Sequence, residues 1–246
     1  VSGRKIIDLP GLRAAGRSGD LFYPLDHKLL IPLPEGSRLF VLPEREAVGF
    51  DRRGKPANAG TEHNAVAAFL PAGYVALSIP AFIRNKNAPA LPLFSYTAVC
   101  WHRGKFHVPA VWVDADPRHD PCGIDMAKVK AGIRRMLKEQ PRNRLLAHHA
   151  KTCALEYGCP NACNLFLGRW EAPVAVSEGC NASCRGCISA RTSTTIQPPQ
   201  ERIDFTPTVD EIAGLAVPHL EKNGKVMVSF GQGCEGEPLL KGNLIE

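Results

Sequence analysis

Long hydrophobic runs and aromatic side chains are scarce in this sequence. The chain has 246 residues, and none of its apolar runs approaches the roughly twenty residues that a transmembrane helix needs. The sequence therefore predicts no membrane partner. Aromatic residues make up 7% of the chain, and the most basic segment contains none of them, so it lacks the usual stacking platform for single-stranded nucleic acids. There is also no internal repeat, which excludes a solenoid.

Cysteine, by contrast, is abundant. The chain has nine cysteines, an odd number, and most of them are clustered at short spacings. Such clustering is more typical of metal binding than of a disulfide framework in a chain of this length. Thiols kept available for metal indicate a reducing compartment, and we predict a cytoplasmic location.

Three of these cysteines are the most informative feature of the chain. Cys180, Cys184 and Cys187 lie in the run SEGCNASCRGC. Their sulfur ligands favour zinc, copper(I) or an iron–sulfur cluster, and three ligands leave one coordination position open. A structural zinc site would need a fourth donor, for which the candidates are Cys159, Cys163, His219 and Cys234.

The residues around this triad predict a βαβ unit. Residues 172–176 and 225–230 are expected to form buried strands. A helix is expected over 208–222, with Thr208 and Glu211 as a capping box and Pro218 as a kink or an early end. The second strand leads into the loop GQGCEGEP at 231–238. Both loops then follow the carboxyl ends of parallel strands, where α/β sheets bind their ligands.

With Cys180, Cys184 and Cys187 after the first strand and Gly236, Glu237 and Pro238 after the second, residues 170–246 resemble the radical S-adenosylmethionine (radical SAM) superfamily. The resemblance implies an enzyme in which the cysteines hold a 4Fe-4S cluster and SAM chelates the unique iron. The Gly236–Pro238 segment would contact the methionine amine. Glu237 is the favoured contact because its GEP context matches, with Glu235 as the alternative.

The chemistry implied by this resemblance is reductive cleavage of SAM to methionine and a 5′-deoxyadenosyl radical. It further implies a flavodoxin- or ferredoxin-like one-electron donor. The residue before the third cysteine is usually aromatic in the family and covers the adenine, whereas here it is Gly186. The substrate and the reaction on it are left open.

The family fold is a partial (β/α) barrel, of which this chain would supply only the first two strands. We therefore expect an α/β fold that begins such a barrel, in a chain that is an incomplete and inactive fragment. The alternative function is a non-catalytic zinc- or nucleic-acid-binding protein that uses the cysteines structurally.

A basic helix is expected before this core. Between residues 125 and 151 there are eight basic residues and two acidic ones, and apolar residues recur at helical spacing over 126–137. RNA binding is possible on this surface, but a solvated helix face is favoured.

A second cysteine group follows the helix. Cys153, Cys159 and Cys163 have three interpretations: an auxiliary cluster with Cys100 or Cys122, a zinc site, or small buried residues. The adjacent pair His148 and His149 is expected at the surface.

Residues 1–122 are expected to form a β-rich module of short strands at 38–42, 74–79, 93–99 and 106–113, with a hairpin turn at Arg103-Gly104. The turn-rich stretch 114–121 is interpreted as a boundary. The predicted domains are 1–122, a connector at 123–169 that carries the basic helix and the second cysteine group, and the core at 170–246.

Overall fold

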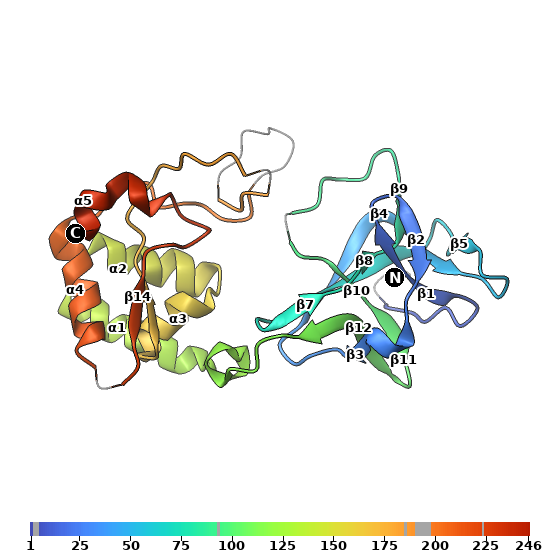
Figure 1. The fold of residues 1–246 in the computed structure, drawn as a ribbon, viewed down its shortest axis with the longest axis horizontal. Coiled ribbons are helices and arrows are strands. Elements are labelled where there is room, and N and C mark those ends of the chain that lie inside the picture. Colours follow the sequence, from blue (N-terminus) through green and yellow to red (C-terminus); the bar gives the residue numbers. More distant parts are fainter. Residues whose placement is uncertain (2–4, 93, 185, 190–197, 223) are drawn as a thin grey trace. The chain divides into compact units, whose positions relative to one another are not determined.

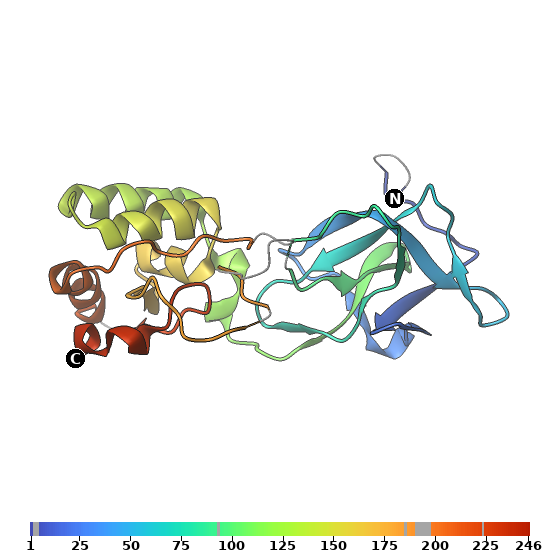
Figure 2. The same cartoon turned by 90° about the horizontal axis from the view of Figure 1, so that it is seen from above.

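The computed structural model describes residues 1, 5–92, 94–184, 186–189, 198–222 and 224–246. The chain divides into two compact units, Val1–Cys122 and Gly123–Glu246, which are drawn in blue to green and in green to red in Figures 1 and 2. The division falls directly after the turn-rich stretch 114–121.

The first unit is built from antiparallel strands. The strands of its larger sheet are β1 (Arg13–Ser18), β2 (Leu21–Pro24), β4 (Arg38–Phe50), β5 (Pro56–Asn58), β6 (Asn64–Phe69), β8 (Ile79–Pro80), β9 (Phe82–Arg84) and β10 (Thr97–Ala98). The main path runs β10-β6-β4-β1-β2, while β5 and β9 pair with β4 and β8 pairs with β1. The long strand β4 is therefore the centre of this sheet.

A smaller sheet contains the predicted hairpin. Its strands are β3 (Leu30–Pro32), β7 (Tyr74–Ala76), β11 (Cys100–His102) and β12 (Lys105–Trp112). Strands β11 and β12 pair antiparallel around Arg103 and Gly104, whose φ angles of 49° and 75° are those of a tight hairpin turn. Short 3-10 helices complete the unit: η1 (His27–Leu29), η2 (Pro117–His119) and η3 (Pro121–Gly123), which crosses the boundary.

The predicted strand 93–99 is mostly wrong. Only Thr97–Ala98 pairs in the sheet, and Leu93 lies outside the described residues. Phe94 packs on Phe40, with ring centroids 5.7 Å apart, and the Tyr96 ring meets both edge-on. Aromatic packing therefore holds Phe94 and Tyr96 in place, and not the β pairing that the sequence pattern predicted.

The second unit is mainly helical. Its elements are α1 (Met126–Glu139), α2 (Arg144–His148), the π-helical segment η4 (His149–Glu156), α3 (Pro160–Leu167), β13 (Glu171–Pro173), α4 (Val209–Leu220), β14 (Met227–Ser229), η5 (Pro238–Lys241) and α5 (Gly242–Ile245). The predicted basic helix is confirmed as α1, which begins after the capping residue Asp125. The chain as a whole is thus a mixed α/β protein with β-rich N-terminal sheets followed by helices.

Strands β13 and β14 pair in parallel, with Ala172 opposite Val228, and α4 lies between them in the chain. Both strands are shorter than predicted. Beyond Pro173, Val174 makes one further ladder bond, from its N–H to the Ser229 carbonyl at 2.8 Å. Within the part of the chain that the structure describes, this pair is a two-stranded sheet, and no barrel forms.

Helix α4 begins at the predicted capping box, since the Thr208 and Glu211 side chains each accept the other's backbone N–H. The early end expected at Pro218 is wrong, because α4 continues through this residue to Leu220. A proline leaves the carbonyl four residues earlier without its helical donor. Here that carbonyl, on Gly214, accepts a hydrogen bond from Gln140 Nε2 at 2.7 Å, so the interruption is satisfied by another helix.

The core of this unit lies where α3 packs on β13 and α1 packs on α3. Figure 1 shows these green and yellow helices grouped together, and α4 adds Ile212 and Leu215 to the same core. The apolar run after β13, 174–176, is fully buried in this core. The chain then leaves the core and enters the cysteine loop.

Candidate functional site

The two predicted site loops of the second unit lie directly against each other. Gly236 N–H donates to the Ser177 carbonyl at 2.9 Å, and Glu237 N–H donates to the Gly179 carbonyl at 2.7 Å. Ser177 and Gly179 immediately precede Cys180. The structure therefore brings the loop after β14 to the start of the cysteine loop after β13, at the carboxyl ends of two parallel strands.

Gly236 has no space for a side chain at this junction. A Cβ atom there would lie 2.1 Å from the Ser177 oxygen and 2.2 Å from the Gly179 oxygen. Both obstacles are backbone atoms that cannot rotate away, so the close approach of the two loops requires glycine at this position.

Glu178 ties the start of the cysteine loop to its surroundings. Its carboxylate accepts hydrogen bonds from Thr206 Oγ1 at 2.8 Å and from Lys241 Nζ at 3.1 Å. Its own backbone N–H, followed by these two partners, lowers the pKa of Glu178 to about 2. The residue is therefore a fixed anion one position before Gly179.

The three cysteines of the predicted triad are not equally exposed to solvent. Cys180 and Cys184 are exposed and unbridged, and Cys187 is half-buried. These three described sulfur atoms do not all lie within 4.8 Å of one another. Donors of one tetrahedral zinc ion are about 3.8 Å apart, from Zn–S bonds of about 2.3 Å, so the loop is not gathered to the spacing of a single-ion site.

A cation lies beside the third cysteine. The Arg202 guanidinium is 3.8 Å from Cys187 Sγ and donates to Ser189 Oγ at 3.1 Å. A neighbouring guanidinium stabilises a thiolate, the form that binds metal. Arg185 and residues 190–197 of the same loop lie outside the described residues.

The two carboxylates considered for the amine contact occupy different environments. Glu235 is buried and accepts from Ile203 N–H at 2.7 Å, and its other oxygen lies 2.8 Å from His148 Nε2. Glu237 is half-exposed, and its side chain accepts from Leu239 N–H at 3.1 Å. Glu235 is thus held by protein groups, while Glu237 stays at the loop surface beside the cysteine loop.

The three cysteines of the second group stay together in the fold, since Cys153 and Cys163 are buried in one core and Cys159 packs against it. Cys153 lies with His148 and Glu235, and their ligand atoms all fall within 4.8 Å of one another. Cys163 belongs to the apolar core, where burial raises the pKa of its thiol to about 11. Cys100 and Cys122 belong to the first unit.

The expectation of surface histidines is wrong. His149 is fully buried, and burial lowers the pKa of its imidazole to about 3. The His148 side chain is 10% exposed. The sequence gives no signal for this burial, because the partner Glu235 is 87 residues away.

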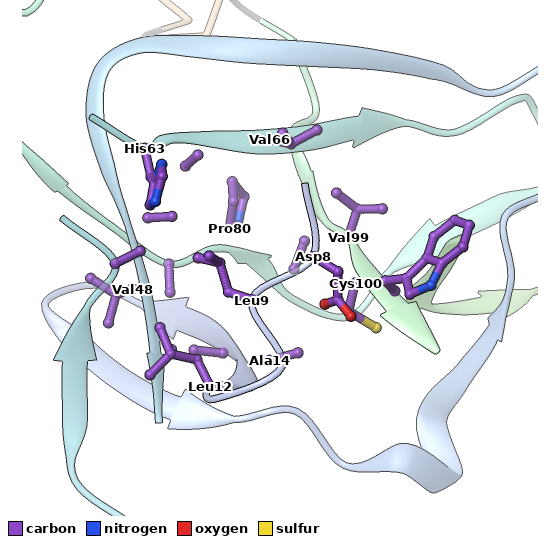
Figure 3. Close-up of a pocket in the computed structure, with 18 of the residues that line it drawn as sticks. Asp8, Leu9, Leu12, Ala14, Val48, His63, Val66, Pro80, Val99 and Cys100 are labelled. Carbon is purple, nitrogen blue, oxygen red and sulfur yellow. The ribbon is translucent and has the colours of Figure 1, made fainter. Parts of the chain in front are cut away.

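A cavity of about 550 Å³ lies in the first unit (Figure 3). Figure 3 shows Leu9, Leu12 and Val48 lining it, with Asp8 and Cys100 nearby. Burial, followed by the charge of Asp8, raises the pKa of the Cys100 thiol to about 11. The volume lies within the range of small-molecule pockets, and the lining mixes apolar residues with Asp8, Arg13 and His63. The protonated thiol is a weak nucleophile.

Comparisons of the chain with protein families, curated proteins and solved structures found no match. Among the described residues, none of the helices has both the length and the apolar character required to cross a membrane.

Proposed function

We propose that the second unit is the beginning of a radical SAM core, in which Cys180, Cys184 and Cys187 hold a 4Fe-4S cluster. The observation that carries the proposal is the pair of hydrogen bonds from Gly236 and Glu237 to the residues that precede Cys180. The two motifs that define the resemblance lie in loops at the ends of neighbouring parallel strands, where such sheets bind cofactors.

The residues present fit the group that the resemblance implies. Two accessible thiols and a third beside a guanidinium are suitable soft donors for iron. In a four-iron cluster each thiolate binds a different iron, so the three sulfurs need not meet at one ion. When bound, the cluster would supply one electron for reductive cleavage of SAM.

The chain's own residues would bind and orient SAM. Glu237 is a carboxylate at the surface of a loop fixed to the cysteine loop, and would receive the methionine amine. Glu178 keeps the backbone at 177–179 in place through Thr206 and Lys241. Gly186 offers no side chain for the adenine, so another part of the protein would cover that ring.

The proposed activity is thus one-electron cleavage of SAM followed by hydrogen abstraction, with electrons from a flavodoxin- or ferredoxin-like donor. The partial-barrel architecture is part of the same proposal. A cytoplasmic location fits a site built on reduced thiols.

The alternative, a non-catalytic zinc- or RNA-binding protein, has weaker support. The triad lacks single-ion spacing. In the basic segment, the Arg144 guanidinium donates to Glu211 at 2.8 Å and lies over the Phe205 ring at 4.5 Å. That arginine is therefore used within the fold, which leaves less of the basic surface for a polyanion.

The test is anaerobic reconstitution of the chain with iron and sulfide. We expect about four irons per chain and a spin-resonance spectrum of the reduced protein that changes when SAM is added. Cys184→Ala should abolish iron uptake, and Cys122→Ala, an exposed cysteine of the other unit, should leave it unchanged. Zinc uptake without iron uptake would support the alternative and refute the proposal.

A further inference from the structure

We propose that His148, Cys153 and Glu235 bind a single divalent transition-metal ion, most suitably zinc, at a second site separate from the cysteine triad. Their ligand atoms all lie within 4.8 Å of one another, and all three side chains are largely buried. Buried charged groups in proteins are paired with one another or coordinate a metal.

The π-helical segment η4 is what places two of these ligands on one side. In an α-helix, residues five apart are rotated by about 500°, and so point about 140° away from each other. A π-helix instead closes its hydrogen bonds between residues five apart, as Tyr157 N–H does with the Thr152 carbonyl at 3.0 Å. His148 and Cys153 are separated by this interval across the start of η4, and π-helical turns recur at functional sites.

The third ligand comes from the loop after β14. Glu235 is held in position by Ile203 N–H, which donates to Oε2 at 2.7 Å and leaves Oε1 directed at His148 Nε2, 2.8 Å away. This backbone donor orients the carboxylate as outer-shell partners do in metal sites. The ion would insert between the carboxylate and the imidazole.

Two further thiols are available as a fourth donor. Cys159 N–H donates to the Cys153 carbonyl at 2.8 Å, and both Cys159 and Cys234 are near enough to contribute to the raised pKa of the Cys153 thiol, which burial causes first and Glu235 second. A donor set of nitrogen, oxygen and one or two sulfurs suits zinc better than magnesium or calcium.

Binding would require defined proton changes. The Cys153 thiol loses its proton to solvent. The proton between His148 Nε2 and Glu235 Oε1, which are 2.8 Å apart, must also leave this contact by exchange with solvent. The ring then carries one proton on Nδ1 and presents the Nε2 lone pair to the ion. Cys153 thereby becomes a thiolate in a buried site. Its negative charge and that of Glu235 are balanced by the divalent ion, so no buried charge is left uncompensated.

Binding of the ion would hold the 231–238 loop in place. Glu235 is adjacent to Gly236, whose N–H bonds to the Ser177 carbonyl. An ion on Glu235, His148 and Cys153 would fix this loop to η4 and hold residues 236 and 237 against the cysteine loop. Ion binding itself does not depend on the proposed activity.

The test uses the full chain with Cys180, Cys184 and Cys187 all changed to Ser, so that the triad cannot take up metal. Anaerobic titration with Co²⁺, a spectroscopic substitute for zinc, should give about one ion per chain and a cysteine-to-cobalt charge-transfer band. Cys153→Ser should weaken Co²⁺ binding at least tenfold, the lower end of the loss known even for outer-shell partners. Cys122→Ser should change nothing.

Glu235→Gln and Glu237→Gln form a second matched pair. Glutamine at 235 keeps a hydrogen-bonding group but loses the negatively charged oxygen that would bind the metal, so Co²⁺ affinity should fall at least tenfold. Glu237→Gln should leave Co²⁺ affinity unchanged. These variants also decide the question if Cys153→Ser does not fold, as judged by circular dichroism.

Absence of Co²⁺ binding in the triad-free chain, or equal binding by Glu235→Gln and its control, would overturn the second site. Either result leaves iron uptake by the intact triad untouched, so failure here is distinguishable from failure of the proposed function.

Discussion

The two thiol groups of the second unit are built in opposite ways. Cys180 and Cys184 are exposed on a loop whose sulfurs are spread apart, whereas Cys153 is buried in a π-helical segment beside His148 and Glu235. In the loop, backbone hydrogen bonds from residues 236 and 237 fix the entrance at residues 177–179, and Arg202 contacts Cys187 and Ser189. A metal group would therefore organise the first set of ligands, while the fold already organises the second.

The largest expected effect is on the free energy of unfolding, and it concerns the contact between helices α1 and α3. A Cβ at Gly132 of α1 would lie 2.0 Å from the Phe166 carbonyl oxygen of α3. Gly132→Ala should destabilise the unit by about 2–4 kcal/mol, because overpacking against backbone exceeds the gain of about 1 kcal/mol in helix propensity. Urea unfolding measures the difference.

Gly214→Ala in α4 is the matched control. Its Cβ would meet Gln140 Oε1 at 2.5 Å, the end of a side chain that can move, at the cost of its hydrogen bond to the Gly214 carbonyl. We expect a loss at least about 1 kcal/mol smaller than for Gly132→Ala. Equal losses at the two helical glycines would show that the α1–α3 contact is not rigid.

The next effect concerns the junction of the two loops. Gly236→Ala should cost about 1–3 kcal/mol, less than Gly132→Ala because a loop can shift. Shifting would break the hydrogen bonds to Ser177 and Gly179, so iron uptake by the triad should fall along with stability. Iron content after reconstitution and the urea midpoint are the two measurements.

Gly233 of the same loop provides the comparison, since a Cβ there would meet nothing within 4 Å. Gly233→Ala should retain both iron uptake and stability. If Gly236→Ala also takes up iron normally, contact between the two loops does not matter for the triad.

The smallest effect tests the polar contacts around α4. Glu211 accepts from Arg144 and Thr208, and its pKa is lowered to about 2, first by the Arg144 side chain. A lowered carboxyl pKa stabilises the fold above the unfolded value, and this contribution is lost as the pH falls from about 4.5 towards 2. Glu211→Gln should thus cost about 1 kcal/mol at pH 7.

The free-energy cost of Glu211→Gln should become smaller as the pH falls from about 4.5 towards 2. Asp210→Asn, an exposed acidic residue in the same first turn, is the control and should show a smaller loss at pH 7. A cost for Glu211→Gln that is constant from pH 7 to pH 2 would contradict the assigned role of the carboxylate.

The sequence predicted the features that local residue patterns control. The capping box at Thr208, the hairpin turn at Arg103-Gly104 and the basic helix α1 each depend on neighbours within a few residues. The order of strand, loop, helix and strand likewise followed from short patterns, and was enough to expect the loops of β13 and β14 at one edge of the sheet.

The features that the sequence missed depend on distant partners. Helix α4 passes through Pro218, and the Gly214 carbonyl that lacks its helical donor is bonded by Gln140, 74 residues away. The His148, Cys153 and Glu235 group requires a π-helical turn and a loop 82 residues after Cys153, neither of which has a local sequence signature. Tertiary contacts, rather than residue type, decided both.

The most direct test of the central claim is electron–nuclear double resonance on the reduced, reconstituted protein with SAM whose methionine amine carries nitrogen-15. We expect a nitrogen-15 coupling to the cluster spin, because the amine would bind the iron that the three cysteines leave open. We also expect Glu237→Gln to weaken SAM binding. A reduced cluster that shows no nitrogen-15 coupling at saturating SAM would contradict the assignment.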